Sequence, residues 1–139
     1  MADDRTLVTL NRLIENARDA ERGFRTASGA VADPALRRLF MTYAHQRADF
    51  ARELSEEVAR LGGTPVDRGS VAGALHRAFL NLRAAVGNRD ERAVIAEAER
   101  GEAASVGAYR QALGAADLPA EVAKHVQCEP PSSPSRHAR

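Results

Sequence analysis

The chain has no tryptophan, one cysteine, 4% aromatic residues and no excess of charge of either sign. A single cysteine, Cys128, excludes an internal disulfide and a zinc site built from several thiolates of one chain. The 20 basic and 19 acidic residues leave a net charge of +1, which provides no electrostatic footprint for nucleic acid and no polybasic signal for a membrane surface. We therefore expect neither nucleic acid nor membrane among the partners.

Long apolar runs are also absent. No segment approaches the ~20 consecutive apolar residues that span a bilayer. The N-terminal sequence MADDRTLVTL has neither the basic region nor the apolar core of a signal peptide. These absences favour a cytoplasmic location, and a length of 139 residues is typical of one domain with one core.

What the sequence does contain is the spacing of amphipathic helices. Apolar residues recur three and four positions apart, alanine is abundant, and alternating strand-like runs are absent. The pattern predicts four long helices and a short fifth one, at about residues 5–31, 34–61, 70–86, 91–113 and 119–127. Four amphipathic helices joined by three short links predict an all-α four-helix bundle of two antiparallel hairpins.

Local signals mark the helix ends. Asp33 followed by Pro34 is typical of a helix start, and Asp90 can cap the fourth helix. The sequence GGTP at 62–65 is typical of a helix end. The link at 62–69 covers roughly 27 Å when extended at ~3.4 Å per residue, which permits either a ferritin-like crossover or a simple turn.

The C-terminal sequence CEPPSSPSRHAR differs in composition from the rest of the chain. It is rich in proline and serine and lacks the apolar side chains that a packed core requires. We therefore expect a bundle domain at residues 1–127 and a disordered tail at residues 128–139.

Five polar side chains interrupt the apolar stripes near the middle of the predicted helices: Glu21, Arg47, His76, Glu99 and Glu102. Counting from each turn at 1.5 Å per residue places them on the order of 15–20 Å from the turns, so they could meet in one buried polar layer. Tyr43 and Tyr109 flank this layer. Because an unpaired buried charge costs several kcal/mol, these groups must be paired or must bind something.

Three interpretations of the layer are open. In the first it is a structural ion network, in which Arg47 satisfies one or two carboxylates. In the second, Glu21, His76, Glu99 and Glu102 bind iron or another divalent metal through carboxylate oxygens and an imidazole. In the third, the helices enclose a pocket for a small ligand, a lipid or a partner helix. The chain has no Glu-x-x-His motif, which bundle metal sites use, and this absence favours the first interpretation.

The tetrapeptide Ala-Glu-Arg-Gly occurs twice, at 20–23 and at 98–101. Each copy places a glutamate beside the apolar stripe and a glycine inside a helix, where glycine costs about 1 kcal/mol relative to alanine. A close approach of helices beside the polar layer, or a local π-bulge, would account for such a glycine.

Longer segments carry a family resemblance. NRLIENARDAERGF, ALRRLF, HQRADFARELSEEVARLGG, GSVAGALHRAF and AEAERGEAASVGAYRQAL resemble a bacterial ferritin-like four-helix-bundle family, a domain of unknown function. The resemblance spans residues 7 to about 126. It implies a ferritin-like bundle in a small cytoplasmic protein, and it carries no catalytic residues to transfer.

Together these observations predict an uncharacterised ferritin-like bundle that acts as a structural or interaction protein with a buried polar layer. The alternative is a di-iron-like bundle for iron storage or for oxygen or peroxide chemistry. A homo-oligomer formed through helix faces is the partner that the sequence leaves open.

Overall fold

The computed structural model describes residues 4–69 and 74–114, which form four α-helices and no strand. The helices are α1 (Asp4–Gly29), α2 (Pro34–Arg60), α3 (Ala74–Gly87) and α4 (Glu91–Gly114). The predicted all-α fold with four long helices is confirmed. The predicted fifth helix at 119–127 and the tail at 128–139 lie outside the described residues. None of the helices within the described ranges is long and apolar enough to cross a bilayer.

The ends of the helices follow the local signals in the sequence. Asp33 Oδ1 accepts a hydrogen bond from Ala35 N at 3.0 Å and caps α2. Gly62 follows the last turn of α2 with a φ of 89°, a conformation that glycine adopts without steric cost. Asp90 Oδ1 accepts from Ala93 N at 3.1 Å at the start of α4. These caps satisfy backbone groups that a helix end otherwise leaves unpaired.

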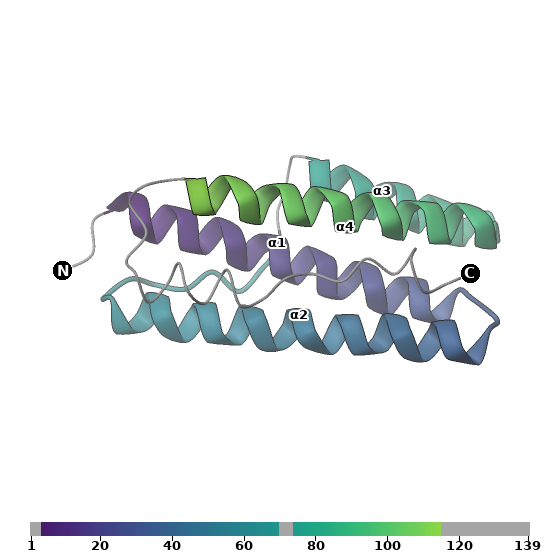
Figure 1. Ribbon diagram of the computed structural model, residues 1–139, viewed down its shortest axis with the longest axis horizontal. Helices are drawn as coiled ribbons and strands as arrows, with labels where there is room; N and C mark the ends of the chain where they lie inside the picture. The colour runs from purple at the N-terminus through teal and green to yellow at the C-terminus, as the bar shows by residue number, and fades with distance from the viewer. Residues whose placement is uncertain (1–3, 70–73, 115–139) are drawn as a thin grey trace.

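Helix α1 lies at the centre of the bundle. Helix α2 runs along one side of it, and α3 and α4 run along the other (Figure 1). Helix α1 contacts all three other helices, and its residues are therefore buried on several faces. Its buried residues include the polar Thr6, Asn16, Asp19 and Ser28. A helix with neighbours on two sides presents a wider buried surface than the single stripe of a surface helix.

The link from α2 to α3 runs along α1 rather than across the whole bundle. Asn11 Nδ2 donates to the carbonyl of Thr64 at 3.2 Å, and Asn11 Oδ1 accepts from Val66 N at 3.0 Å. Arg68 of the link pairs at 3.2 Å with Glu15, which lies further along α1 than Asn11. The link therefore advances along α1, from Asn11 beside Thr64 and Val66 to Glu15 beside Arg68.

Helix α3 continues in the direction that the link has taken. As a result α1 and α3 run one way, and α2 and α4 run the other (Figure 1). A full-length crossover of the ferritin-like kind would instead leave the second and third helices parallel. The four-helix bundle is shown, whereas its ferritin-like character is not confirmed.

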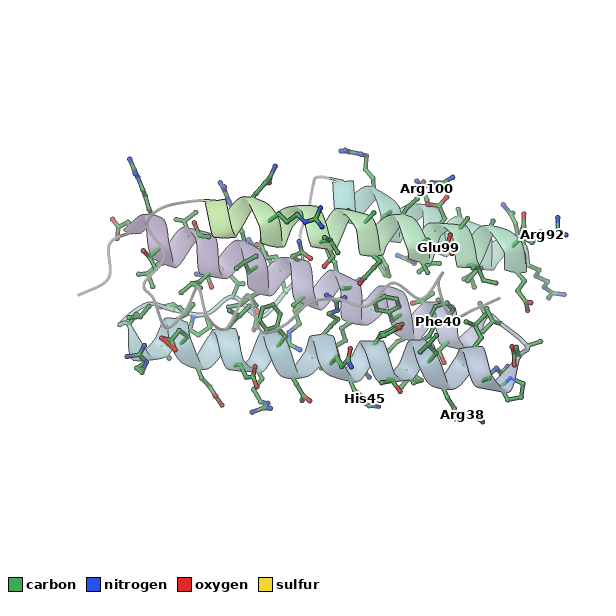
Figure 2. The ribbon with its side chains drawn as sticks, viewed as in Figure 1. Arg38, Phe40, His45, Arg92, Glu99 and Arg100 are labelled. Carbon is green, nitrogen blue, oxygen red and sulfur yellow. The ribbon has the colours of Figure 1, made fainter. Side chains whose placement is uncertain are left out.

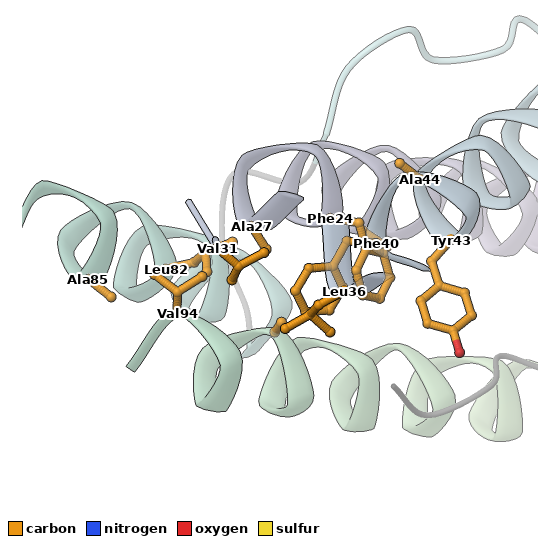
Figure 3. Close-up of a cluster of buried hydrophobic side chains, with 12 residues drawn as sticks. Phe24, Ala27, Val31, Leu36, Phe40, Tyr43, Ala44, Leu82, Ala85 and Val94 are labelled. Carbon is orange, nitrogen blue, oxygen red and sulfur yellow. The ribbon is translucent and has the colours of Figure 1, made fainter. Parts of the chain in front are cut away.

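The hydrophobic core is divided along the bundle into two clusters. One cluster joins the first half of α1 to the second half of α2: Leu10, Leu13, Ile14, Ala17, Phe50, Ala51, Leu54 and Val58. The other joins the remaining halves of these helices to α3 and α4, with Phe24, Phe40 and Tyr43 among its buried side chains (Figure 3). The Phe24 ring lies 5.9 Å from the Phe40 ring and 5.3 Å from the Tyr43 ring, measured between centroids. Polar residues occupy the level between the clusters.

Candidate functional site

Arg47 and Glu102 form the centre of this polar layer. Nη2 of Arg47 lies 2.7 Å from Oε1 and 2.9 Å from Oε2 of Glu102. Nη1 of Arg47 donates to Oγ of Ser105 at 3.3 Å. The two charged side chains are only 2% and 3% exposed. Because Arg47 belongs to α2 while Glu102 and Ser105 belong to α4, the pair connects the two hairpins inside the bundle.

The helical period places Arg47 inside the molecule. Its neighbours at three- and four-residue spacing on α2, Tyr43, Ala44, Phe50 and Ala51, are all buried, so residue 47 falls on the same face. The guanidinium carbon lies 6.0 Å from the centre of the Phe24 ring on α1. An arginine in this position needs a partner charge within the protein, because its guanidinium is always protonated.

Burial governs the ionisation of the groups around the pair. Burial raises the pKa of Glu102, and the positive charge and hydrogen bond of Arg47 oppose this shift without cancelling it. Burial also raises the pKa of Tyr43, aided by the negative charge of Glu102 and opposed by Arg47. The Tyr43 hydroxyl points towards α4 (Figure 3). A neutral phenol therefore borders the ion pair at neutral pH.

Glu21 lies apart from the buried pair, contrary to the expected single layer. Its Oε1 pairs with Arg18 at 2.9 Å and its Oε2 with Arg25 at 3.0 Å, both on α1. These arginines precede and follow Glu21 by three and four residues, the spacing at which side chains of one helix meet. The local pairing holds the carboxylate at the edge of the bundle, where it is 14% exposed.

The remaining predicted site residues are not joined to the pair. Glu99 and His76 are half-buried, and neither forms a hydrogen bond or an ion pair with another residue of the described ranges. Tyr109 belongs to α4, but its side chain lies outside what the structure describes. Of the five residues proposed for the layer, the structure brings together Arg47 and Glu102.

Asp19 and Asn16 are among the buried polar residues of α1 that the apolar pattern of the sequence did not single out. Asp19 is 1% exposed and Asn16 is 8% exposed. Oδ1 of Asp19 lies against Gly69 in the link, so closely that a Cβ at that position would overlap it. The stripe drawn through Glu21 places Asp19 on another face, and only the course of the link shows that this face is covered.

The two Ala-Glu-Arg-Gly segments meet at one small pocket. Ala20, Gly23, Ala98 and Gly101 all line it, and so does Glu102. The pocket has a volume of ≈ 20 Å³, which is room for about one water molecule. It is too small for an organic cofactor, so the interpretation of the bundle as a container for a lipid or another small organic ligand has no support in this pocket.

Neither explanation offered for the glycines accounts for Gly23. A Cβ built at Gly23 would lie 3.7 Å from Leu82 Cδ2, an ordinary van der Waals contact, so close helix approach does not demand glycine. The residue also lies within an uninterrupted α-helix.

The arrangement of donors does not fit a metal ion. Within residues 4–69 and 74–114, no three histidine, cysteine, aspartate or glutamate side chains come together as a candidate metal site. Both oxygens of Glu102 are engaged by Arg47, and both oxygens of Glu21 are engaged by arginines on α1. A cation at either carboxylate would have to displace a guanidinium and then face its positive charge.

Comparison with known proteins places the chain in a family. No curated protein and no solved structure matches the chain significantly. A family model described as a domain of unknown function (DUF2383) matches residues 5–115. The match extends from the first turn of α1 to the end of α4. The chain therefore belongs to this family, DUF2383.

Proposed function

We propose that the protein is a structural or interaction module, in which a buried ion pair fixes one helical hairpin against the other. The observation that carries this proposal is the complete engagement of the Glu102 carboxylate by Arg47, at 2.7 and 2.9 Å. A carboxylate used in this way supports helix alignment, and a ligand at either oxygen would have to compete with the guanidinium of Arg47.

The geometry supports a role in alignment more than a role in raw stability. A buried ion pair is weak evidence for stability, because desolvation of both charges offsets much of their attraction. Arg47 and Glu102 can form these hydrogen bonds in only one register of α4 against α2. A shift of one residue along a helix moves a side chain by 1.5 Å and turns it by about 100°. Arg47 thereby selects a single position of α4 against α2.

A metal-dependent bundle is the competing proposal, and its expected ligands are dispersed. Glu21 pairs with arginines on its own helix, Glu102 pairs with Arg47, and Glu99 and His76 make no polar contact with other described residues. No observation of the described residues favours iron storage or oxygen chemistry over the structural role.

Metal analysis of the purified protein tests the choice between the two proposals. We expect far less than one equivalent of iron, manganese or zinc, and a melting temperature that neither these metals nor a chelator changes. A metal present at a free concentration of 100 times its Kd would raise the free energy of unfolding by about 2.7 kcal/mol. A thermal melt detects such a change readily. Stoichiometric metal together with such a rise would overturn the structural proposal.

Matched variants identify the ligands if metal does bind. Glu99→Gln and His76→Ala remove two expected ligands that form no hydrogen bond or ion pair with another described residue. Under the structural proposal both variants keep the melting temperature of the wild type with and without metal. A metal-induced rise that is lost in both variants would establish the metal site.

A further inference from the structure

The outward face of α3 has an apolar centre. Leu80, Ala84 and Gly87 follow one another at spacings of four and three residues, and all are exposed. Leu80 is 46% exposed and is one of two large hydrophobic residues exposed in the described ranges. A Cβ built at Gly87 would meet nothing within 4 Å. The outward side of a surface helix is ordinarily polar, whereas the centre of this face is formed by leucine, alanine and glycine.

Arginines flank the apolar stripe on both sides. At about 100° per residue, Arg77 lies roughly 60° to one side of Leu80 and Arg83 roughly 60° to the other. Both arginines are exposed. The segment Ala74–Gly87 contains no acidic residue, so the face of α3 carries positive charge only.

The fold leaves these charges without a carboxylate partner. On the other helices several arginines form ion pairs with acids three or four positions away, as Arg52 does with Asp49 at 3.5 Å. Arg77 and Arg83 form no ion pair with any residue in the described part of the chain. The guanidinium carbon of Arg83 instead lies 5.9 Å from the centre of the Phe79 ring, a contact that keeps its charge available.

The core does not account for this face either. Helix α3 packs inward through Ala78, Phe79, Leu82 and Ala85, which are all buried. Leu80, Ala84 and Gly87 lie on the opposite side and are exposed. Covering the exposed part of the Leu80 side chain removes apolar surface from water, a gain that a binding partner can provide and the folded chain alone does not.

We propose that this face of α3 docks an acidic amphipathic helix of a partner protein, a step that rests on the interaction role proposed above. The apolar side of the partner helix covers Leu80, Ala84 and Gly87, whose spacing is the one by which helices recognise each other. Its carboxylates pair with Arg77 and Arg83. The small residues Ala84 and Gly87 let the partner backbone approach closely.

Charge complementarity selects this occupant over the others. A second copy bound through the same face would be related by two-fold symmetry, which brings the arginines of the two copies together and costs binding energy. Each basic residue near an anionic membrane contributes only weakly to binding, and this face offers two arginines and one leucine. An acidic helix matches both the stripe and the charges.

A labelled synthetic peptide tests the surface. The probe is an amphipathic helix with leucine and alanine at i, i+4 and i+7 and glutamate on both flanks, and fluorescence anisotropy follows its binding to the full chain. We expect binding that weakens as salt is raised and that is lost for a peptide with lysine in place of glutamate. We expect Arg77→Glu combined with Arg83→Glu to weaken binding at least about tenfold, because each reversal replaces attraction by repulsion, and Leu80→Glu to do the same.

Arg38→Glu is the matched control. Arg38 is exposed on the outward side of α2, away from α3 (Figure 2), and it forms no ion pair with a described residue. This variant should bind the peptide as the wild type does. Circular dichroism melts check that every variant remains folded, which is expected because all the substituted residues are exposed.

Several results would overturn the proposal. They are failure of the wild type to bind the probe, an equal loss of affinity in Arg38→Glu, self-association that Leu80→Glu removes, or binding to phosphatidylserine vesicles that the arginine reversals abolish. The metal measurement is independent of these outcomes. Stoichiometric metal would therefore defeat the proposed function alone, and failed peptide binding would defeat the docking surface alone.

Discussion

Arg47 is the largest fully buried side chain of the described residues, and one carboxylate balances its charge. Single residues therefore differ greatly in their importance to this bundle. Arg52, exposed on the same helix, pairs with Asp49 and Glu56 at 3.5 and 3.7 Å, yet such surface pairs contribute about 0–1 kcal/mol. A charged side chain near the middle of α2 has a large effect on stability only where the surrounding residues exclude water.

Replacing Arg47 alone should destabilise the protein severely. Arg47→Met leaves the Glu102 carboxylate buried without its guanidinium, so we expect the free energy of unfolding to fall by about 3–5 kcal/mol. The double variant Arg47→Met with Glu102→Leu removes both charges and should recover most of this loss. Chemical denaturation followed by circular dichroism measures both values.

Arg52→Met provides the control for the loss of an arginine on α2, and it should change stability by no more than about 1 kcal/mol. Equal destabilisation in the single and double variants would contradict the argument, since the stranded charge would then not be the cause.

The stability contributed by Glu102 should decrease as pH rises. Burial raises the pKa of Glu102 in the folded protein above the ordinary value of 4.5, so the folded state holds the proton more tightly than the unfolded state. This contribution is fully present below pH 4.5 and is lost as pH rises through the folded pKa. Relative to Glu102→Gln, the wild type should lose at most about 1.4 kcal/mol per pH unit in that interval.

Denaturation at a series of pH values gives this slope, and Glu56→Gln controls for the loss of a glutamate at an exposed position. A slope of the opposite sign would show that attraction to Arg47 outweighs the cost of burying the carboxylate.

The extents of the helices were largely predictable, because the signals that end a helix are local. The Asp33 cap, the glycine at 62 and the Asp90 cap each act within a few residues. The local arginines that capture Glu21 were also visible in the sequence, at positions 18 and 25. The position of Glu21 beside the apolar stripe predicted that it joins a common layer, whereas the two nearby arginines favour local pairing on α1.

Glycines in the helices and in the link should respond oppositely to alanine. In Gly23→Ala the new Cβ lies 3.7 Å from Leu82, so the variant should gain up to about 1 kcal/mol from helix propensity. In Gly63→Ala the Cβ would lie 2.8 Å from Leu7 Cδ2 and 3.1 Å from Val58 Cγ1. We expect that crowding to cost about 1–3 kcal/mol.

Thermal or chemical denaturation of the two glycine variants, side by side, makes the comparison. Gly29→Ala is a useful third variant because its Cβ would meet nothing within 4 Å. A destabilised Gly23→Ala would show that the small pocket beside it must stay open for folding.

At the scale of the whole molecule, the sequence predicts less. The pattern along α1 does not state how many helices surround it, and the burial of Asp19 follows from the link and from neighbours on two sides. The direction of α3 depends on where the link travels, which the spacing of apolar residues does not encode. Arg47 and Glu102 were identifiable as buried charges, whereas their pairing depends on how the two hairpins pack together.

The divided core has a consequence for how the bundle opens. Two apolar clusters meet at a level where charges and hydrogen bonds replace apolar contacts, and interactions of that kind depend on geometry far more steeply than apolar packing does. Such a level is a natural boundary between cooperative units. We therefore expect one end of the molecule to open while the other retains its structure, as two cooperative units that share α1 and α2.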